Sequence, residues 1–430
     1  MKRDQDFLPH YPTNALEVSL LLAKLSATED PYVYFSEIIP TFKTPGNQQV
    51  VYTITIVFGV LFGIVIVVCV LVIAYPLLQK SGSQGNDAWL FRRCHTTHST
   101  SSMPYFVLNG GMFLAVCQFI GCIAFEAFII TSFLAYMYPS RMYEPYQAFL
   151  QISMWIPGFC GFFVSAFSAS YVCISTAEEE PRFFFQRPEC YNILLLLIPL
   201  YVTLQALGWA MADFMVVHRQ LRAFSVLLVI LGSASQKWKD HPKIDSDQLN
   251  RILKAFRTVN KLTCSRFGIS RGATIAWIPF SFSLLIFYLY TIFSLFRLLQ
   301  RSVRSTRYDI MKKSLNKRIP MSTIPHLSAP PNEAVMHIQR SYRFLLWHCV
   351  FMSFCIVWNA GVGLIFLLWV PQVVSDADRT SSSSWLLINE SICLGGGAFL
   401  SIGMIFQSFR IMSEGRRKPI PEPDKHEDRA

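Results

Sequence analysis

The sequence predicts an all-α membrane protein, a bundle of seven transmembrane helices with the N-terminus outside and the C-terminus in the cytosol. Composition is the first indication: 52% of the 430 residues are hydrophobic and only 15% are charged, whereas soluble domains carry about 25% charged residues. The second indication is a series of long apolar runs. The third is the distribution of lysine and arginine between those runs.

Seven segments are long enough to cross a bilayer, because a hydrocarbon core of about 30 Å requires about 20 mostly apolar residues in a helix. None of them contains Lys or Arg, and together they hold three of the 27 acidic residues. Backbone amides in lipid need partners within their own segment, so each run must be helical. In chain order the segments are 50–78, 105–134, 147–175, 191–217, 272–296, 344–370 and 385–409.

The tails and the connections set the orientation. Residues 1–49 form an extracellular tail without a signal-peptide pattern, residues 50–409 form the transmembrane domain, and residues 410–430 form a cytosolic tail. With the N-terminus outside, Lys and Arg total 21 on the inner side and 17 on the outer side, and the connection 218–271 contributes 11 of those 17. Positive charge concentrates on the cytosolic side of membrane proteins, which favours this orientation.

The connection 218–271 leaves two interpretations open. Its apolar stretch "AFSVLLVILGSA" has about 12 residues, which is short for a crossing. We therefore expect 218–235 to be an interfacial or tilted extension of the fourth helix, with an eighth crossing through 221–235 as the alternative. Further along, "DQLNRILKAFRTVNKL" (247–262) places apolar residues on one helical face and basic residues around it. This pattern predicts an amphipathic helix that lies on a membrane surface.

Three carboxylates lie within the predicted spans. Glu126, Asp213 and Glu390 all fall in the outer half of the bilayer, and no basic residue lies within any span. Ionisable groups in lipid are costly and usually face a bundle interior or a water-filled cavity. Together with Gln118 and Asn389 they predict a polar pocket for a cationic or hydrogen-bonding ligand. The alternative is that acids near helix ends simply reach headgroup water.

The segment 297–343 is the second candidate functional region. It begins "RLLQRSVRSTRYDIMKKSLNKR" and continues the fifth helix into a basic inner connection. Such a segment contacts either a cytosolic signalling partner or the anionic inner leaflet. The residues that we expect to make these contacts are Arg297, Arg301, Arg304, Lys312 and Lys313.

Several patterns that would indicate an enzyme are missing from the sequence. There is no GxxxxGK[ST] loop and no HExxH. The "CHTTH" stretch at 94–98 is an incomplete set of metal ligands. The 11 cysteines are scattered, mostly through apolar runs, which indicates small hydrophobic residues and not a disulfide framework. We expect no enzymatic activity, no cofactor and no metal, and the net charge of +11 favours the lipid bilayer over nucleic acid as a partner.

This layout resembles that of G-protein-coupled receptors and, more loosely, the orphan seven-helix membrane proteins of fungi. The resemblance covers about residues 50–410 and rests on layout alone. The third helix ends in "CISTAEEEP" where rhodopsin-like receptors carry Asp/Glu-Arg-Tyr, and the seventh, "LLINESICLGGGAFLSIGMIFQSF", has no Asn-Pro-x-x-Tyr. No residue roles are therefore carried over from that family.

From these features we predict a receptor-like protein of the plasma membrane that senses an extracellular ligand through the outer half of its bundle. It would signal to a cytosolic partner through 297–343. Two alternatives stay open. One is a transporter of small molecules or ions that uses the intramembrane carboxylates, and the other is a structural membrane protein without a ligand.

Overall fold

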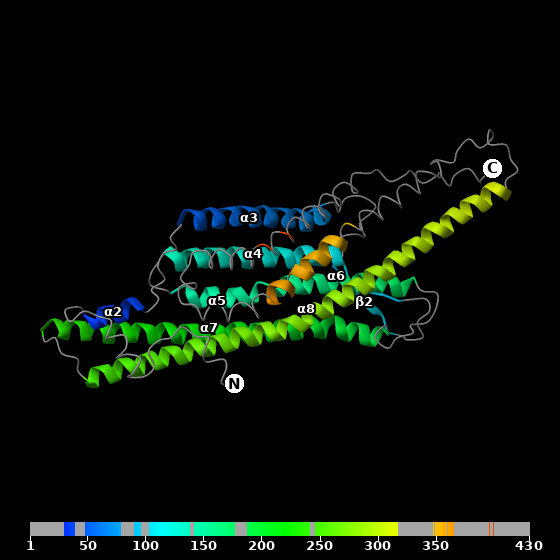
Figure 1. The fold of residues 1–430 in the computed structure, drawn as a ribbon. Coiled ribbons are helices and arrows are strands. Elements are labelled where there is room, and N and C mark those ends of the chain that lie inside the picture. The colour runs from blue at the N-terminus through cyan, green and yellow to red at the C-terminus, as the bar shows by residue number, and fades with distance from the viewer. Residues whose placement is uncertain are drawn as a thin grey trace.

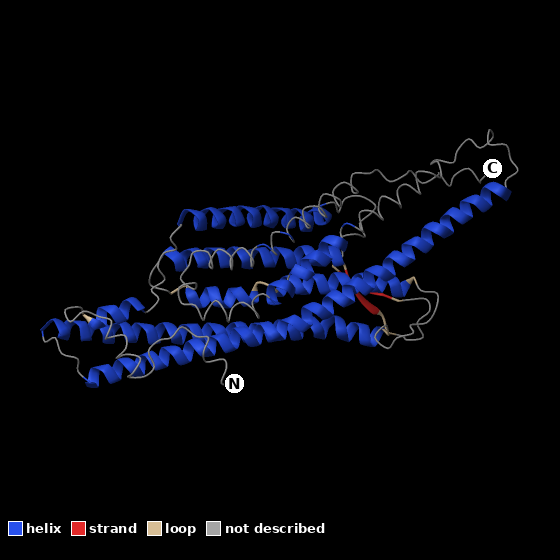
Figure 2. Cartoon of the chain, in the orientation of Figure 1, coloured by secondary structure: helices blue, strands red, loops and turns tan. Residues whose placement is uncertain are grey.

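The structure is a computed structural model, and its described part is almost entirely helical (Figures 1 and 2). It describes residues 30–38, 48–78, 90–95, 103–137, 142–176, 187–240, 246–316, 347, 349–358, 360–364, 395 and 399. The helices are α2 (Pro31–Ile38), α3 (Gln48–Leu78), α4 (Gly110–Met137), α5 (Glu144–Ser153), α6 (Ile156–Ser175), α7 (Pro188–Asp240) and α8 (Ser246–Asn316). Strands β1 (Phe91–Cys94) and β2 (Tyr105–Leu108) form one antiparallel pair.

Among the described residues, five helical stretches are long and apolar enough to cross a membrane, so the protein is an all-α membrane protein. They are Thr55–Ala74, Gly110–Leu134, Glu144–Ser175, Pro188–Asp240 and Ser246–Leu298. Each overlaps one of the first five predicted crossings.

The last two predicted crossings are described only in small part. In 344–370 the stretches 349–358 and 360–364 are helical, and 385–409 lies outside the described residues except for two positions. The total of seven crossings and the orientation of the termini therefore stay predictions.

Two predicted boundaries were wrong. The run 105–134 does not begin as a helix, because Tyr105–Leu108 is the strand β2 and α4 starts at Gly110. The run 147–175 is divided into α5 and α6 by a turn at Met154 and Trp155. Proline stands in the first turn of α6, where its missing N–H costs no hydrogen bond.

The β1–β2 pair caps one end of the bundle. Its register pairs Phe91 with Leu108 and Cys94 with Tyr105. Asn192, in the first turns of α7, fixes the pair in place. Its Oδ1 accepts a hydrogen bond from the Phe106 N–H, and its Nδ2 donates one to the Pro104 carbonyl, both at 2.8 Å.

Exposed apolar side chains mark the part of the helices that we expect to face lipid. Their longest run on α7 extends from Ile193 to Met215, with a separate group at Val226, Leu228 and Val229, and on α8 they run from Ile275 to Phe293. At 1.5 Å per residue the α7 stretch spans about 33 Å, which matches a hydrocarbon core of about 30 Å. The arginines Arg219 and Arg271 follow directly at one end. We call this zone the apolar belt.

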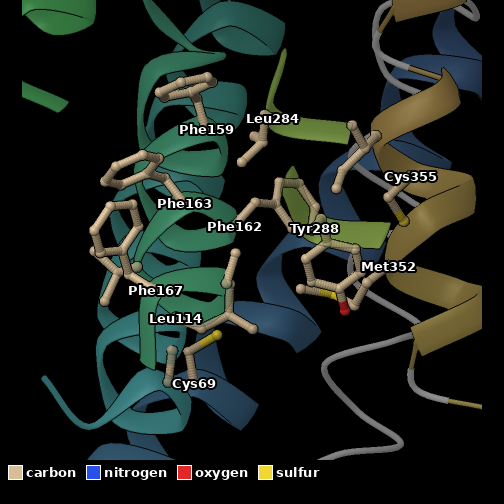
Figure 3. Packing of buried hydrophobic residues seen from close by; sticks show 14 of the residues in the cluster. Cys69, Leu114, Phe159, Phe162, Phe163, Phe167, Leu284, Tyr288, Met352 and Cys355 are labelled. Carbon is tan, nitrogen blue, oxygen red and sulfur yellow. The ribbon is translucent and has the colours of Figure 1, made fainter. Parts of the chain in front are cut away.

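One core joins the helices inside the apolar belt. Its buried residues come from α3, α4, α6, α7, α8, strand β2, Met154 and the 349–358 stretch, and Figure 3 shows Phe159, Phe163 and Phe167 one above another along α6. Phe167 lies 5.1 Å from Phe287 between ring centroids. Helices α4 and α6 approach closely at Gly161, where an added Cβ would lie 2.8 Å from Leu114 Cδ1. Tight packing of this kind gives the bundle one defined arrangement.

Beyond the apolar belt, α7 and α8 continue as an antiparallel pair, residues 218–240 and 246–271, which we call the projecting hairpin (Figure 1). The fourth helix extends beyond residue 217, as expected, because α7 runs without a break from Pro188 to Asp240. No turn therefore separates 221–235 from the fourth crossing, whereas the interfacial or tilted position of the extension stays a prediction. At 1.5 Å per residue α7 is about 80 Å long, more than twice the hydrocarbon thickness.

The projecting hairpin has a hydrophobic core of its own. The apolar face of 247–262 does not lie on a membrane, contrary to the prediction, since Ile252, Phe256 and Val259 are fully buried within the protein. They pack in a cluster with α7 and with α2, and the rings of Phe35 and Phe256 meet at 6.2 Å. Part of the N-terminal tail is thus a helix docked on the hairpin.

Candidate functional site

A cavity of about 110 Å³ lies between α5, α7, α8 and the 360–364 stretch. It extends from Gln205 and Trp277, within the apolar belt, to Asp213 and Ser270, where the projecting hairpin begins. A volume of this size can hold several water molecules or a small ligand. Its lining residues are Gln151, Ile152, Trp155, Gln205, Ala206, Trp209, Asp213, Ser270, Ala273, Thr274, Trp277, Val362 and Gly363.

Periodicity on two helices builds two of the cavity walls. Gln205, Trp209 and Asp213 follow one another at four-residue intervals on α7, which places them on one helical face. On α8, Ser270, Thr274 and Trp277 repeat at intervals of four and three. The opposite faces of both helices carry exposed apolar residues, so each helix presents its polar side to the cavity and its apolar side to lipid.

Asp213 is the one charged residue among those that line the cavity in the described part of the chain. Its side chain is buried, with the residue 5% exposed. Arg266 Nε lies 3.7 Å from Asp213 Oδ1, which is an ion pair but longer than a hydrogen bond. Within the described residues, Asp213 Oδ1 has no hydrogen-bond donor.

The side chain of Gln205 provides a second buried hydrogen-bond acceptor without a donor. Its Oε1 is buried and finds no hydrogen-bond donor among the described residues. Buried polar atoms without partners are rare in proteins because each one costs about 1–3 kcal/mol. Two oxygens without donors on residues that line one cavity mark it as a place where water or a ligand with hydrogen-bond donors would bind.

Three tryptophans make much of the remaining wall, and packing outside the cavity holds two of them. Trp155 makes an edge-to-face contact with Phe125 at 5.5 Å, and Trp277 lies 5.7 Å from Phe159. Trp209 fits against α8 only because residue 272 is glycine, since an added Cβ there would lie 2.8 Å from Trp209 Cη2.

The predicted site residues do not come together in one pocket. Asp213 lines the cavity, but Glu126 lies between α4 and α3, where a Cβ added at Gly59 would lie 3.8 Å from its Oε2. Gln118 is buried and donates from Nε2 to Cys122 Sγ of its own helix at 3.4 Å. The remaining two predicted residues, Asn389 and Glu390, lie outside the described residues.

The predicted basic contacts lie at the opposite end of α8 from the projecting hairpin (Figure 1). Arg297 ends the apolar belt there, with its guanidinium 4.8 Å from the centroid of the Phe293 ring. Arg301 and Arg304 follow as exposed residues. The helix continues through Lys312 and Lys313, whose side chains lie outside the described part of the structure.

No metal site accompanies the cavity: nowhere in the described ranges do three or more His, Cys, Asp or Glu side chains gather as possible metal ligands. Comparison of the chain with protein-family models, curated proteins and solved structures gives no match. The class that the fold defines is therefore that of an all-α membrane protein with a cavity inside its helical bundle, and the function has to be argued from that cavity.

Sequence reasoning found Asp213 and missed the tryptophans. The four-residue spacing of Gln205, Trp209 and Asp213 was a usable signal, because three residues able to bind a ligand recur on one face of a span. Trp155 and Trp277 carry no comparable signal, since buried tryptophans are ordinary bundle residues until the packing is known.

Proposed function

We propose that the protein is a receptor-like membrane protein, which binds a small external ligand in the α5–α7–α8 cavity and signals at the other end of α8. The observation that carries this proposal is the continuity of α8 from Ser246 to Asn316. This one helix contains Arg266, which is paired with Asp213, then a wall of the cavity, then Pro279, where proline favours a kink, and then the basic residues from Arg297 onwards. A shift of α8 at the cavity would move its far end.

The orientation of this proposal is that of the sequence analysis, with the projecting hairpin outside and the segment 297–343 in the cytosol of a cell whose plasma membrane the chain spans. Helices in a packed bundle move as rigid rods between discrete arrangements, and small displacements at one end are transmitted to the other. The cytosolic partner would read the position of exposed side chains such as Arg301 and Arg304.

The transporter alternative receives less support. It needs a polar path that uses several carboxylates, but among the described residues Asp213 lines the cavity and Glu126 does not. Glu126 faces the glycines of α3 instead. Binding without a continuous path is what a sensor requires.

The test measures whether occupancy of the cavity moves α8. A donor–acceptor pair of fluorescent amino acids at the exposed positions Ser175 and Arg304 would report the distance between α6 and α8 in the full chain, reconstituted in lipid nanodiscs. We expect a small molecule from a panel of cations, anions and neutral compounds to change energy transfer. Ala273→Phe, which fills the cavity, should abolish the response.

Ile275→Phe is the matched control, because position 275 is exposed on the lipid side of the same helical turn. It should leave the response intact. A panel that produces no change in energy transfer, or an equal response in Ala273→Phe, would contradict the proposed function.

A further inference from the structure

We infer that the cavity binds a small organic cation that carries N–H donors, that is, a primary or secondary ammonium. The inference rests on the proposed function for its biological meaning, but its chemistry depends only on the residues of the cavity. The ligand has to meet three separate requirements, and each follows from a different observation. It needs hydrogen-bond donors, a positive charge and a surface that can pack against aromatic rings.

The need for donors follows from the two unsatisfied oxygens. Asp213 Oδ1 and Gln205 Oε1 are both buried acceptors that lack a donor within the described part of the chain. A carboxylate accepts hydrogen bonds and cannot donate them. Residues two turns apart lie about 12 Å apart along the helix axis, so one ammonium group would donate to Asp213, and water would donate to Gln205.

The need for positive charge follows from the lining. Asp213 is the one charged side chain among the described residues that line the cavity, and Arg266, which pairs with it at 3.7 Å, lies outside that lining. An anion would lie against this carboxylate without a cation in the wall to offset it. A neutral alcohol could donate hydrogen bonds but would add no positive charge beside Asp213, and charge-assisted hydrogen bonds are about twice as strong as neutral ones.

Arg266 is the group with which the ligand competes. It holds Asp213 at 3.7 Å and its own side chain is 38% exposed, so the arginine can return to solvent at little cost when an ammonium takes its place. It also lies one helical turn from Ser270 of the cavity wall, which ties ligand binding to the base of the projecting hairpin.

The tryptophans complete the fit. Trp155, Trp209 and Trp277 line the same volume, and indole faces attract cations more strongly than other aromatic side chains do. The cavity volume of about 110 Å³ limits the ligand to a small amine. A peptide or a lipid headgroup with an extended acyl chain does not fit these dimensions.

The experiment measures binding to the purified full chain in nanodiscs by thermal shift and tryptophan fluorescence. The probes are benzylammonium, the neutral benzyl alcohol, the anionic benzoate, and tetramethylammonium as a cation without N–H groups. We expect benzylammonium to bind at least tenfold more tightly than each of the other three.

Three variants separate the inference from simple partitioning into a membrane protein. Asp213→Asn should weaken benzylammonium binding at least tenfold, whereas Arg266→Gln should strengthen it severalfold by removing the competitor. Glu126→Gln is the matched control, an intramembrane acid outside the cavity lining, and should change nothing.

The inference would be overturned by preferred binding of benzoate or benzyl alcohol, by equal binding of tetramethylammonium, or by no binding of any probe. It would also be overturned by unchanged affinity in Asp213→Asn or by weaker affinity in Arg266→Gln. Its failure differs from failure of the proposed function. Binding that follows this pattern without movement of α8 would remove the receptor role and keep the ligand class. Movement of α8 caused by a non-cationic probe would remove the ligand class and keep the receptor role.

Discussion

The two regions of the α7–α8 pair differ in the side chains that they expose. Inside the apolar belt the outward faces are apolar, as at Leu204, and the buried side combines apolar residues such as Val202 with Gln205 and Asp213 of the cavity wall. In the projecting hairpin the buried side is apolar, as at Leu227 and Phe256, and exposed basic residues stand beside exposed apolar ones such as Val229. Both regions therefore have an apolar interior, and it is their outer surfaces that differ in charge.

The difference shows that the surroundings change along a continuous helix without any break in the backbone. Lipid tolerates apolar side chains and penalises charge, whereas water favours burial of apolar area at about 25 cal/mol per Å². The exposed side chains change from apolar to largely basic between Asp213 and Arg219 on α7 and near Arg271 on α8. The cavity lies at this change of surroundings, where a ligand can enter from water and meet an interior carboxylate.

The largest expected effect comes from removing the core of the projecting hairpin. Phe256 is fully buried and contacts α2 through Phe35, so Phe256→Ala should destabilise the hairpin by about 3–5 kcal/mol. Limited proteolysis should then cut within 218–271 while the belt stays protected. Leu228→Ala, at a position 45% exposed, should digest like the unsubstituted chain, and equal protection of both variants would contradict the assigned core.

A charge scan should sharpen the boundary between the two regions. Leu204 and Val229 are 61% and 73% exposed on the same helix, yet only Leu204 lies within the belt. Leu204→Lys should cost about 3 kcal/mol of membrane insertion, whereas Val229→Lys should cost almost nothing. Insertion can be measured by glycosylation of reporter sites in microsomes, and equal costs at both positions would mean that the hairpin lies in lipid.

Part of this fold could be predicted from the sequence. The apolar runs predicted the five stretches of the described chain that are helical and long and apolar enough to cross a membrane, because lipid demands about 20 apolar residues wherever a helix spans it. The run 105–134 was misread at its start, since "YFVL" is equally apolar in a strand and in a helix.

The remaining misreadings concern partners. Periodicity showed that one face of 247–262 is buried, but it cannot tell lipid from protein, and here the partners are α7 and α2. In the same way, the sequence showed that an ionisable residue such as Asp213 is costly to place in lipid, but it did not reveal that Trp155 and Trp277 line the same cavity. Contacts between distant segments depend on packing that single-helix patterns do not encode.

A smaller effect is expected at the close approach of Trp209 to α8. Gly272→Ala would place a methyl group 2.8 Å from the indole and should cost about 1–3 kcal/mol through overpacking. It should also alter tryptophan fluorescence, because the ring has to move within the cavity wall. Gly268→Ala, one turn earlier with nothing within 4 Å of an added Cβ, should instead be neutral or stabilise by about 0.5–1 kcal/mol.

The smallest expected effect lies at the junction of the two regions. Gln220 Nε2 donates a hydrogen bond to Thr263 Oγ1 at 2.9 Å, and Gln220→Ala should cost about 1 kcal/mol. Thr263 keeps its bond to the Val259 carbonyl, so no hydroxyl is left unsatisfied. Denaturant titration of the purified protein would measure the loss, and a cost as large as that of Phe256→Ala would show that polar contacts dominate the hairpin.

The most direct test of the account asks whether α7 and α8 leave the lipid where the two regions meet. Single cysteines at Leu204, Val229 and Lys254 would be treated with a membrane-impermeant maleimide in intact and in opened cells, with the unsubstituted chain as background. The account predicts rapid labelling at Val229 and Lys254, from outside the cell in the proposed orientation, and no labelling at Leu204. Protection of Val229 and Lys254 to the same degree as Leu204, in intact and opened cells alike, would contradict it.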